Sequence, residues 1–376
     1  MSNRFTITDK VIGKGGFGKV FIAYEKNSMN KIYAAKEIKF DKLKSELKNN
    51  DNEEDEKEDS KKEIKDMNDV LNKAIIELNN EVSILLDFNN KNLVKLYDIV
   101  SNDNSLSLIL EYSNGGDLAK VYKEWVKKNN NNILPENIIR KIIKDVLNGL
   151  SCLHRNYIIH HDIKLQNILV FFDNEEDLKN LNLIKAHYKL TDFGLSQYYV
   201  DLRNVQFGGS IQYFPFEIIK FMKYSKKQNE DELKKFLQSD KVDMFAIGIL
   251  IYKLLFCLNP FLTNTSTKQN TILKNLKEDS FDKLQIYLGK RQKISKEILV
   301  LLDTLLKKNP DNRYSSELCE FSRFITRKSK DFHYIDKNNI ETIKIDNFVN
   351  VDVDDYVITI DMTVNQYLRD YDIFEE

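Results

Sequence analysis

The first part of the chain alternates between strand-like and helix-like spacing of its hydrophobic residues. Residues 5–39 carry β-forming side chains in short runs broken by a cluster of glycines, which predicts strands joined by tight turns. From residue 70 to residue 85, apolar side chains recur every three or four positions, which predicts a helix. Two short strands are then expected at about residues 94–100 and 106–111.

The rest of the chain has mostly helical spacing. Pro135 opens a long amphipathic stretch, PENIIRKIIKDVLNGLSCLH, and proline is favoured near the first turn of a helix. Residues 242–258 are apolar nearly all round, which is typical of a helix buried in a large domain. Residues 172–186 are expected to form a polar insertion between two short strands.

A charge-rich segment separates the first strands from the first helix. It contains the run NNDNEEDEKEDSKKEIKD, which is nearly free of apolar residues. Such a run cannot bury enough apolar surface to offset the entropy lost on ordering. We therefore expect a disordered insertion at about residues 41–66.

Composition narrows the class of protein. The 376 residues are 42% hydrophobic and 31% charged, with a formal net charge of −1, which is ordinary for a globular protein. So small a net charge supplies no overall field that would attract nucleic acid or an anionic membrane. The longest apolar stretch, residues 245–258, is too short to cross a bilayer and contains Lys253. We expect neither a nucleic-acid partner nor a transmembrane segment.

The cysteines and the N-terminus indicate the compartment. Cys152, Cys257 and Cys319 lie far apart in apolar surroundings, so we expect buried thiols in a reducing environment. The N-terminal residues have no apolar signal core. The expected location is the cytoplasm or the nucleus.

A glycine-rich run lies between two strand-like segments. Its sequence is Gly13-Lys14-Gly15-Gly16-Phe17-Gly18, and such a run alone is a weak signal, because tight turns and dinucleotide sites also use it. A dinucleotide site would place the run before a helix, whereas here a strand follows. A hairpin whose backbone amides cover phosphates is therefore favoured. Lys36 follows on the next strand, where a lysine can reach those phosphates.

Two further motifs complete an ordered set. The first is His160-His161-Asp162-Ile163-Lys164-Leu165-Gln166-Asn167, followed by an apolar strand, and the second is Asp192-Phe193-Gly194, preceded by one. Each motif alone means little, but the order of glycine run, strand lysine, DxKxxxN block and DFG is specific. From about residue 5 to residue 325, the chain resembles the eukaryotic protein kinase family.

The resemblance implies an α+β fold of two lobes. Residues 1–112 would form an N-lobe of antiparallel sheet plus one helix, interrupted by the insertion. Residues 113–326 would form a mainly helical C-lobe, and residues 327–376 a C-terminal extension outside the family domain. The implied activity is transfer of a phosphoryl group from ATP, with Mg²⁺, to serine or threonine hydroxyls of a protein substrate.

The resemblance also implies how ATP would be bound. Lys36 takes the place of the phosphate-anchoring lysine, and its partner is Glu77 or Glu81 on the following helix. Glu81 is preferred, because the run that follows it matches the family. Backbone groups of Glu111 and Ser113 would bond adenine. The full expected set is Ile12, Gly13, Lys14, Gly15, Gly16, Phe17, Gly18, Val20, Ala34, Lys36, Glu111, Ser113, Asp117 and Leu169.

Catalytic roles follow from the same resemblance. Asp162 would orient the substrate hydroxyl and accept its proton. Lys164 would stabilise charge on the transferring phosphoryl group, and it indicates serine/threonine specificity. Asn167 and Asp192 would be the magnesium ligands, since both offer the hard oxygen donors that Mg²⁺ prefers.

The later motifs match the parts of the family that hold a peptide substrate. Ser210 would lie beside Asp162, Glu217 would pair with Arg313, and Asp243 would hold the catalytic loop. His160, in the same resemblance, is a structural residue rather than a base.

Two departures from the family pattern affect regulation and specificity. His161 stands where an arginine usually receives an activation-segment phosphate, and residues 197–208 contain no serine or threonine. We therefore hypothesise that activity does not depend on phosphorylation of that segment. Gln166 is neutral at a position where kinases with basic substrates often carry glutamate. Asp117 is a second acidic position that would attract a basic residue of the substrate.

Several alternatives stay open at this point. The stretches at residues 114–118 and 166–169 resemble the Unc-51-like kinases, and calcium/calmodulin-type and NIMA-related kinases share parts of the pattern. A pseudokinase scaffold is the main rival function. It is disfavoured because the chain has all five key polar residues, which are Lys36, Glu81, Asp162, Asn167 and Asp192. Residues 327–376 have alternating patterns that predict short strands. They would either pack on the domain or recruit a regulatory partner, or else form a partly ordered acidic tail.

Overall fold

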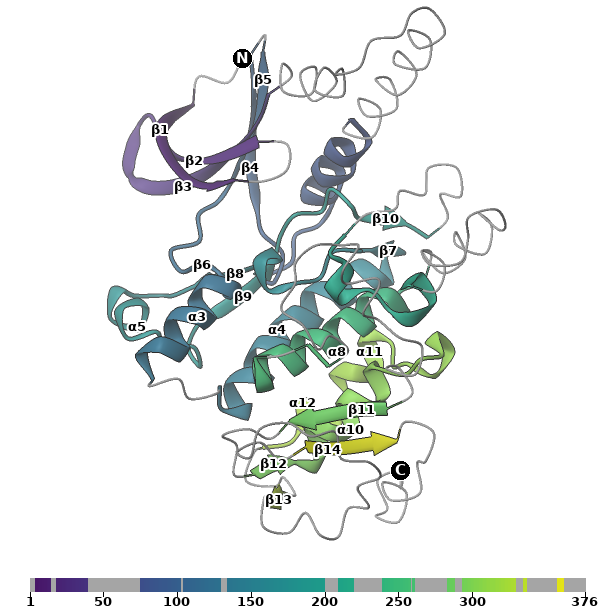
Figure 1. Ribbon diagram of the computed structural model, residues 1–376. Helices are drawn as coiled ribbons and strands as arrows, with labels where there is room; N and C mark the ends of the chain where they lie inside the picture. Colours follow the sequence, from purple (N-terminus) through teal and green to yellow (C-terminus); the bar gives the residue numbers. More distant parts are fainter. Residues whose placement is uncertain are drawn as a thin grey trace, which may run out of the picture. The chain divides into compact units, whose positions relative to one another are not determined.

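The structure is a computed structural model that describes twelve ranges of the chain. These ranges are 4–14, 18–39, 75–102, 104–129, 134–199, 209–219, 239–257, 259–260, 283–287, 293–328, 334–336 and 357–361. The chain divides into two compact units. The first is Met1–Asn114 with Thr191–Ser196, and the second is Gly115–Leu190 with Gln197–Glu376. The first is rich in strands and the second in helices, in agreement with the predicted α+β class (Figure 1).

A five-stranded antiparallel sheet forms most of the first unit. Its strands, in chain order, are β1 (Phe5–Lys14), β2 (Gly18–Glu25), β3 (Ser28–Lys39), β4 (Leu96–Ser101) and β5 (Ser105–Glu111). Their order in the sheet is β1-β2-β3-β5-β4. Residues 75–87 are helical, within the region where helical spacing was found.

An aromatic cluster forms a core against this sheet. Tyr33 packs edge-on against both Phe5 and Tyr97, with ring centroids 5.0 Å apart in each pair. Ala23, Ala35 and Ile109 are fully buried in the same cluster. Aromatic edge-to-face pairs add about 0.5–1.5 kcal/mol to the free energy of area burial. This core holds the middle of β3, the strand that carries Lys36, in place.

Two long helices form the frame of the second unit. Helix α4 (Glu136–Arg155) begins after Pro135, whose φ of −60° suits a helix start, and it buries one apolar stripe. Helix α8 (Lys241–Phe256) is buried nearly all round, as its composition predicted. It ends at Cys257, which adopts a left-handed conformation.

The smaller elements of the second unit connect these helices. The helices are α3 (Leu118–Lys128), α5 (Glu175–Asn180), α10 (Lys296–Leu305), α11 (Ser316–Glu320) and α12 (Arg323–Thr326). The 3₁₀ turns are η1 (Leu165–Asn167), η2 (Ile211–Tyr213) and η4 (Pro310–Asn312). Strands β6 (Gly116–Asp117), β8 (Ile168–Phe171) and β9 (His187–Leu190) form one sheet, and β7 (Ile158–Ile159) pairs with β10 (Gln197–Tyr198).

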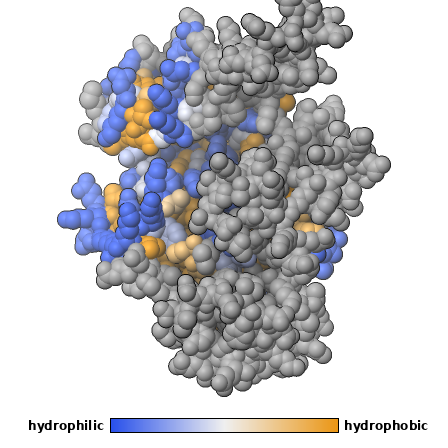
Figure 2. All heavy atoms as spheres, in the orientation of Figure 1, coloured by the Kyte–Doolittle hydropathy of each residue, from blue (hydrophilic) through white to orange (hydrophobic). Residues whose placement is uncertain are grey.

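Residues 172–186 are more structured than a polar insertion. They contain α5, whose N-cap Asn174 accepts a hydrogen bond from the amide of Asp177. Leu183 and Ala186 are buried, and the Leu183 carbonyl accepts a hydrogen bond from the Tyr188 hydroxyl at 2.7 Å. The polar residues cover the outside of this segment, and Figure 2 shows mainly hydrophilic side chains around α3 and α5.

The thiols differ in exposure, contrary to the expectation that all three are buried. Cys319 is buried, Cys152 is half-buried and Cys257 is exposed. Cys257 is exposed because it caps the end of α8, where the chain turns out of the helix. None of the helices in the described ranges is both long and apolar enough to span a bilayer.

Part of the C-terminal extension pairs with the second unit. Strand β13 (Tyr334–Asp336) pairs with β12 (Lys293–Ser295), and β14 (Val357–Asp361) pairs with β11 (Lys283–Tyr287). Strands were expected in this extension, although the alternating runs at 343–345 and 351–353 lie outside the described residues. The predicted insertion at 41–66 and the glycine-run residues Gly15, Gly16 and Phe17 also lie outside them.

Candidate active site

Lys36, Glu81 and Asp192 meet in the first unit. The Lys36 ammonium lies 2.7 Å from both carboxylate oxygens of Glu81 and 3.0 Å from Oδ1 of Asp192. Lys36 comes from the middle of β3 and Glu81 from the helical residues 75–87. The pairing of Lys36 with Glu81 rather than with Glu77 is the one that the sequence favoured.

Burial and charge act in opposite directions in this cluster. Burial alone lowers the pKa of Lys36, but the carboxylates of Glu81 and Asp192 raise it above its ordinary value overall. Burial raises the pKa of Glu81, and the neighbouring Lys36 offsets only part of that effect. Two carboxylates thus face one fixed ammonium, an arrangement suited to a bound polyanion with a metal cation.

The expected nucleotide-binding residues of the first unit lie along the sheet. Val20 on β2 pairs with Lys36, and Ala34 pairs with Leu110 on β5. Gly18 is required by packing, because a Cβ there would lie 1.6 Å from the carbonyl oxygen of Glu37. No other side chain therefore fits where the glycine run rejoins the sheet.

The other residues expected to bind the nucleotide are distributed over both units. Ile12, Gly13 and Lys14 end β1, and Glu111 ends β5, with Ser113 two residues further on. The Glu111 amide donates to the carbonyl of Lys95 at 2.9 Å. Asp117 and Leu169 belong to the second unit, where they pair with each other across β6 and β8. Asp117 also caps α3 and forms an ion pair with Lys120, a structural use that the sequence did not indicate.

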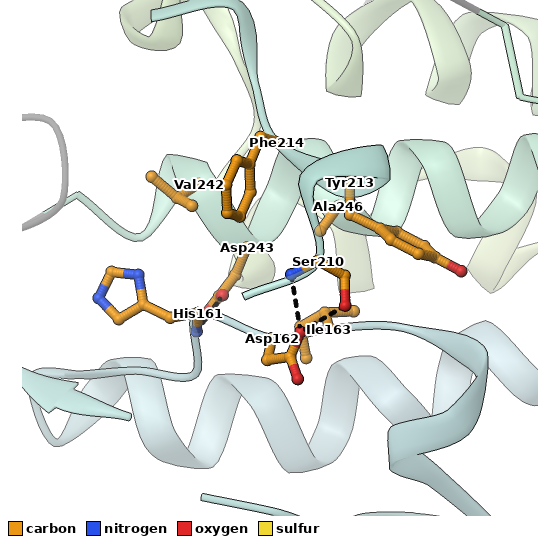
Figure 3. Close-up of a pocket in the computed structure, with 9 residues that line it drawn as sticks. All are labelled: His161, Asp162, Ile163, Ser210, Tyr213, Phe214, Val242, Asp243 and Ala246. Carbon is orange, nitrogen blue, oxygen red and sulfur yellow. Dashed lines mark hydrogen bonds between the residues drawn. The ribbon is translucent and has the colours of Figure 1, made fainter. Parts of the chain in front are cut away.

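Asp162 is the centre of a second polar cluster, in the second unit. Its Oδ1 accepts hydrogen bonds from the Ser210 amide at 3.1 Å and the Ser210 hydroxyl at 3.0 Å. Its Oδ2 lies 2.5 Å from the Lys164 ammonium and 2.9 Å from Nδ2 of Asn167. Lys164 also donates to the Ser210 hydroxyl at 3.1 Å. Figure 3 shows Ser210 lying directly against Asp162, with the His161 ring turned away from that carboxylate.

Asp243 anchors the loop that carries Asp162. Its two carboxylate oxygens accept hydrogen bonds from the amides of His160 at 2.7 Å and His161 at 2.9 Å. Burial alone would raise the pKa of Asp243, but the hydrogen bond from His154 and nearby histidines lowers it overall. Asp243 therefore stays ionised and fixes the loop backbone, as its motif predicted.

His154 is a site residue that the sequence did not indicate. Its Nε2 lies 3.0 Å from Asp243 and its Nδ1 lies 3.0 Å from the Ser316 hydroxyl. Because a carboxylate only accepts, Nε2 carries the proton of the bond to Asp243, while Nδ1 shares a hydrogen bond with the Ser316 hydroxyl. A histidine in the last turn of a helix is usually explained by the helix dipole, so its position carries no separate signal of this role.

Gly209 determines how Ser210 reaches Asp162. Its φ of +119° lies outside the range that other residues readily adopt, and a Cβ there would lie 2.8 Å from the carbonyl oxygen of His161. The turn that follows is held by an ion pair below it. Arg313 donates to both oxygens of Glu217, at 2.6 and 2.7 Å, and both side chains are buried.

His161 is buried and uncharged at neutral pH. Burial lowers its pKa to about 4. Within the described residues its Nε2 has no hydrogen-bond partner. A neutral imidazole offers no cation to a phosphate, which is in keeping with the hypothesis that activity does not depend on activation-segment phosphorylation. His160, fully buried, accepts a hydrogen bond from the Asp162 amide at 3.3 Å, as expected of a structural residue.

The two expected magnesium ligands are Asn167 in the second unit and Asp192 in the first. Asn167 uses Nδ2 to donate to Asp162, which leaves Oδ1, the oxygen that a metal requires. The described ranges hold no group of three or more His, Cys, Asp and Glu side chains placed to bind a metal. Magnesium at a nucleotide site usually needs only one or two protein oxygens besides the phosphates, and each of the two residues offers an oxygen of the kind that magnesium prefers.

Comparison with known proteins adds evidence from outside the chain. The family model described as "Protein kinase domain" matches residues 48–325. Serine/threonine-protein kinase ULK3 of Xenopus laevis is 28% identical over 313 residues, which are 83% of this chain and 53% of that protein. Aurora kinase of Schizosaccharomyces pombe is 27% identical over 311 residues, 82% of this chain and 68% of that protein.

A third relative, NUAK family SNF1-like kinase 1 of Mus musculus, is 27% identical over 262 residues, 69% of this chain and 31% of that protein. The chain thus spans from 31% to 68% of these relatives' lengths. The match to ULK3 agrees with the resemblance to Unc-51-like kinases, and Aurora kinase matches at nearly the same identity. The family match begins after Lys36, so the sheet pairing, rather than the match, connects the glycine run to the domain.

Proposed function

We propose, from the premise that this chain belongs to the protein kinase domain family, that it transfers the γ-phosphoryl group of Mg·ATP to serine or threonine hydroxyls of proteins. The observation that carries the proposal is the cluster at Asp162. A buried carboxylate there holds Ser210, Lys164 and Asn167 by four hydrogen bonds of 2.5–3.1 Å. The cluster thus combines a proton acceptor, a fixed cation and a candidate metal ligand.

Asp162 is the proposed general base. The substrate hydroxyl oxygen would attack the γ-phosphorus as the bond to the ADP oxygen breaks, and its proton would pass to Asp162. The Ser210 hydroxyl already occupies a hydrogen-bonding position on Oδ1, which shows that the carboxylate can accept from a hydroxyl there. Lys164, 3.1 Å from that hydroxyl, would stabilise charge on the transferred group.

Lys36 is the proposed anchor of the nucleotide phosphates, with Glu81 as the residue that orients it. At Gly18, where the glycine run rejoins the sheet, β2 lies so close to the backbone of β3 that a Cβ would lie 1.6 Å from the Glu37 carbonyl oxygen. Asn167 and Asp192 would hold magnesium, which when bound neutralises phosphate charge. Backbone groups of Glu111 and Ser113 are the proposed adenine contacts.

A pseudokinase scaffold is the less favoured function. A scaffold needs the fold but not the hydrogen bonds around Asp162, and the relatives that match are named as kinases. The described residues include each polar side chain to which the proposed transfer assigns a role, namely Lys36, Glu81, Asp162, Lys164, Asn167 and Asp192. The enzyme is therefore the better account of the polar residues retained in both units.

Replacing Asp162 by Asn tests the proposal. We expect phosphoryl transfer to a serine-containing protein or peptide to fall by at least about 100-fold, because the general base is lost, while ATP still raises the unfolding temperature. The matched control is Asp311→Asn, at an exposed aspartate of the same unit. The proposal is wrong if the Asp162 variant transfers phosphate as fast as wild type, or if wild type transfers none to any protein hydroxyl.

A further inference from the structure

Lys253 is a half-buried cation in an otherwise apolar helix. It lies on α8, where all but one of the other residues from Val242 to Phe256 are buried and apolar or small, the exception being Asp243. Its ammonium lies 4.4 Å from the centre of the Tyr213 ring. It also donates a hydrogen bond to the side-chain oxygen of Gln212 at 3.1 Å. Because the Lys253 ammonium contacts both the Tyr213 ring and the Gln212 side chain, it has a defined position rather than the free motion usual for lysine.

The charge of Lys253 is not balanced by a carboxylate. Its recorded partners in the described part of the chain are Gln212 and the Tyr213 ring, and both are neutral. Burial lowers its pKa to about 8, and no charged neighbour contributes to that shift. The ammonium is therefore mostly protonated at neutral pH but incompletely compensated. An anion brought to it would regain free energy that burial has cost.

The turn beside Lys253 is the same one that reaches Asp162. Gln212 and Tyr213 belong to η2, and Ser210, the residue that precedes the turn, bonds to Asp162. The side-chain amide of Asn259 donates a hydrogen bond to the backbone carbonyl of Gln212 at 2.7 Å. A 3₁₀ turn rises only about 2 Å per residue, and an extended peptide spans about 3.3 Å per residue. A substrate whose hydroxyl lies at Asp162 would thus bring a side chain one to three positions away within reach of Lys253.

The two positions at which the family resemblance would place contacts to a basic substrate, Gln166 and Asp117, offer it little attraction. Gln166, in η1, is neutral. Asp117 uses one carboxylate oxygen to cap α3 and the other in an ion pair with Lys120 at 2.9 Å. Asp117 was expected to attract a basic residue of the substrate, but both of its carboxylate oxygens make these contacts within the protein. Beside this turn, Lys253 is the charged group whose partners in the described residues, Gln212 and the Tyr213 ring, are both neutral.

We infer that Lys253 makes this protein select substrates that carry an aspartate or glutamate within three residues of the acceptor serine or threonine. The inference rests on the proposed kinase function and specifies its substrate class. The acidic side chain would accept a hydrogen bond from the Lys253 ammonium in place of, or together with, Gln212. Charge-assisted hydrogen bonds at partly buried positions are strong enough to discriminate between peptides.

A peptide set tests the inference on the wild-type protein. Each peptide holds one serine in an alanine–glycine background, with Asp, Ala or Lys placed singly at each of the three positions on either side. At one or two of these positions we expect kcat/KM to be about tenfold higher with Asp than with Ala, and lower still with Lys. Equal rates for all peptides, or a preference for Lys, would overturn the inference. Transfer to no peptide at all would overturn the proposed function, and this inference with it.

Substitutions at Lys253 identify the residue responsible. We expect Lys253→Met to reduce the ratio of Asp to Ala kcat/KM to about one, and Lys253→Arg to retain most of it. Lys308→Met is the matched control, because Lys308 also lies over an aromatic ring, 4.5 Å from the centre of Phe216. The ratio is compared only in variants that keep the wild-type unfolding temperature within a few degrees. A ratio unchanged in Lys253→Met, or lost equally in Lys308→Met, would contradict the assignment.

Discussion

In the second unit, His161 has a backbone conformation and a protonation state that are unusual for a histidine, and the fold imposes both. His161 has a positive φ of 65°, in the left-handed region, where residues with a Cβ are uncommon. The hydrogen bond from its amide to Asp243 retains that conformation, and burial of its ring keeps the imidazole neutral. The positive φ and the neutral imidazole both follow from the place of His161 in the fold. The same histidine in a surface loop would have neither feature. These features affect stability as well as the loop geometry.

Stability should fall in mild acid because of His161. Its pKa is about 4 in the folded state and 6.5 when exposed, so the unfolded state binds a proton first as the pH falls below 6.5. The stability contribution is intact above pH 6.5 and is lost progressively down to about pH 4. At pH 5 we expect a loss of roughly 2 kcal/mol from this residue, from 1.36 kcal/mol per pH unit.

Urea unfolding at pH 7.5 and pH 5 measures this effect. His161→Gln should lose about 2 kcal/mol less stability between these two pH values than wild type does. His187→Gln provides the comparison at an exposed histidine. Identical pH dependence in wild type and His161→Gln would show that the buried imidazole does not resist protonation.

At the scale of elements, long-range polar pairs lock the short turns around Asp162. The turn η2 and the helical residues 216–219 are too short to be stable alone, since a single helical turn gains few hydrogen bonds for the entropy it loses. The pair of Glu217 with Arg313 ties them to η4, 96 residues further along the chain. Arg313 also donates to three backbone carbonyls, of Lys307, Lys308 and Lys241. One guanidinium therefore determines the positions of several segments.

Replacing Arg313 by Met should be strongly destabilising. The substitution leaves Glu217 buried without its partner and several carbonyls without their donor, and breaking such a pair costs about 3–5 kcal/mol. Denaturant unfolding would show this loss. Arg155→Met is the control, because the pair of Arg155 with Glu317 has the same 2.7 Å distance but more than half of each side chain is exposed. We expect less than about 1 kcal/mol there, and equal losses at the two arginines would contradict the argument.

At the scale of the whole molecule, the two clusters have complementary chemistry. The first unit holds Lys36, the proposed cation for phosphates, together with Asp192. The second holds Asp162, the proposed base for a hydroxyl, together with Asn167. Phosphoryl transfer from Mg·ATP needs a cation for the phosphates, oxygen ligands for the metal and a base for the hydroxyl, and these kinds of group occur in different units. We expect the stabilising effect of Mg·ATP to depend on residues of each unit.

Nucleotide-dependent stabilisation tests that expectation. Mg·ATP should raise the unfolding temperature of the wild-type protein, since a ligand bound to the folded state stabilises it by mass action. The shift should be reduced by Lys36→Met in the first unit and also by Asn167→Ala in the second. The Asn167 effect should vanish when magnesium is replaced by EDTA, whereas the Lys36 effect should not. A full shift in the Asn167 variant would mean that the second unit takes no part in binding the metal nucleotide.

The sequence by itself determined the class of fold and the key polar residues. Local spacing predicts the strands of residues 5–39, the helix after Pro135 and the buried helix α8, because burial on one face gives a periodic apolar pattern and burial on all faces gives a continuous apolar run. The ordered motifs singled out Lys36 and Asp162, and the resemblance to the protein kinase family that these motifs carry indicated Glu81 and Asp243. The polar composition of residues 172–186 was misleading, because a few buried residues such as Leu183 suffice to hold a short helix in place.

Only the tertiary structure decided which distant residues share a contact. His154 and Ser316 are 162 positions apart, and Lys253 and Gln212 are 41 apart. Nothing in the local sequence of either partner indicates the other. The neutral state of His161 and the unbalanced charge of Lys253 depend on burial and on which groups surround them, and these are properties of packing rather than of residue type. A sequence records which groups are available, whereas protonation and pairing depend on distances that the fold alone creates.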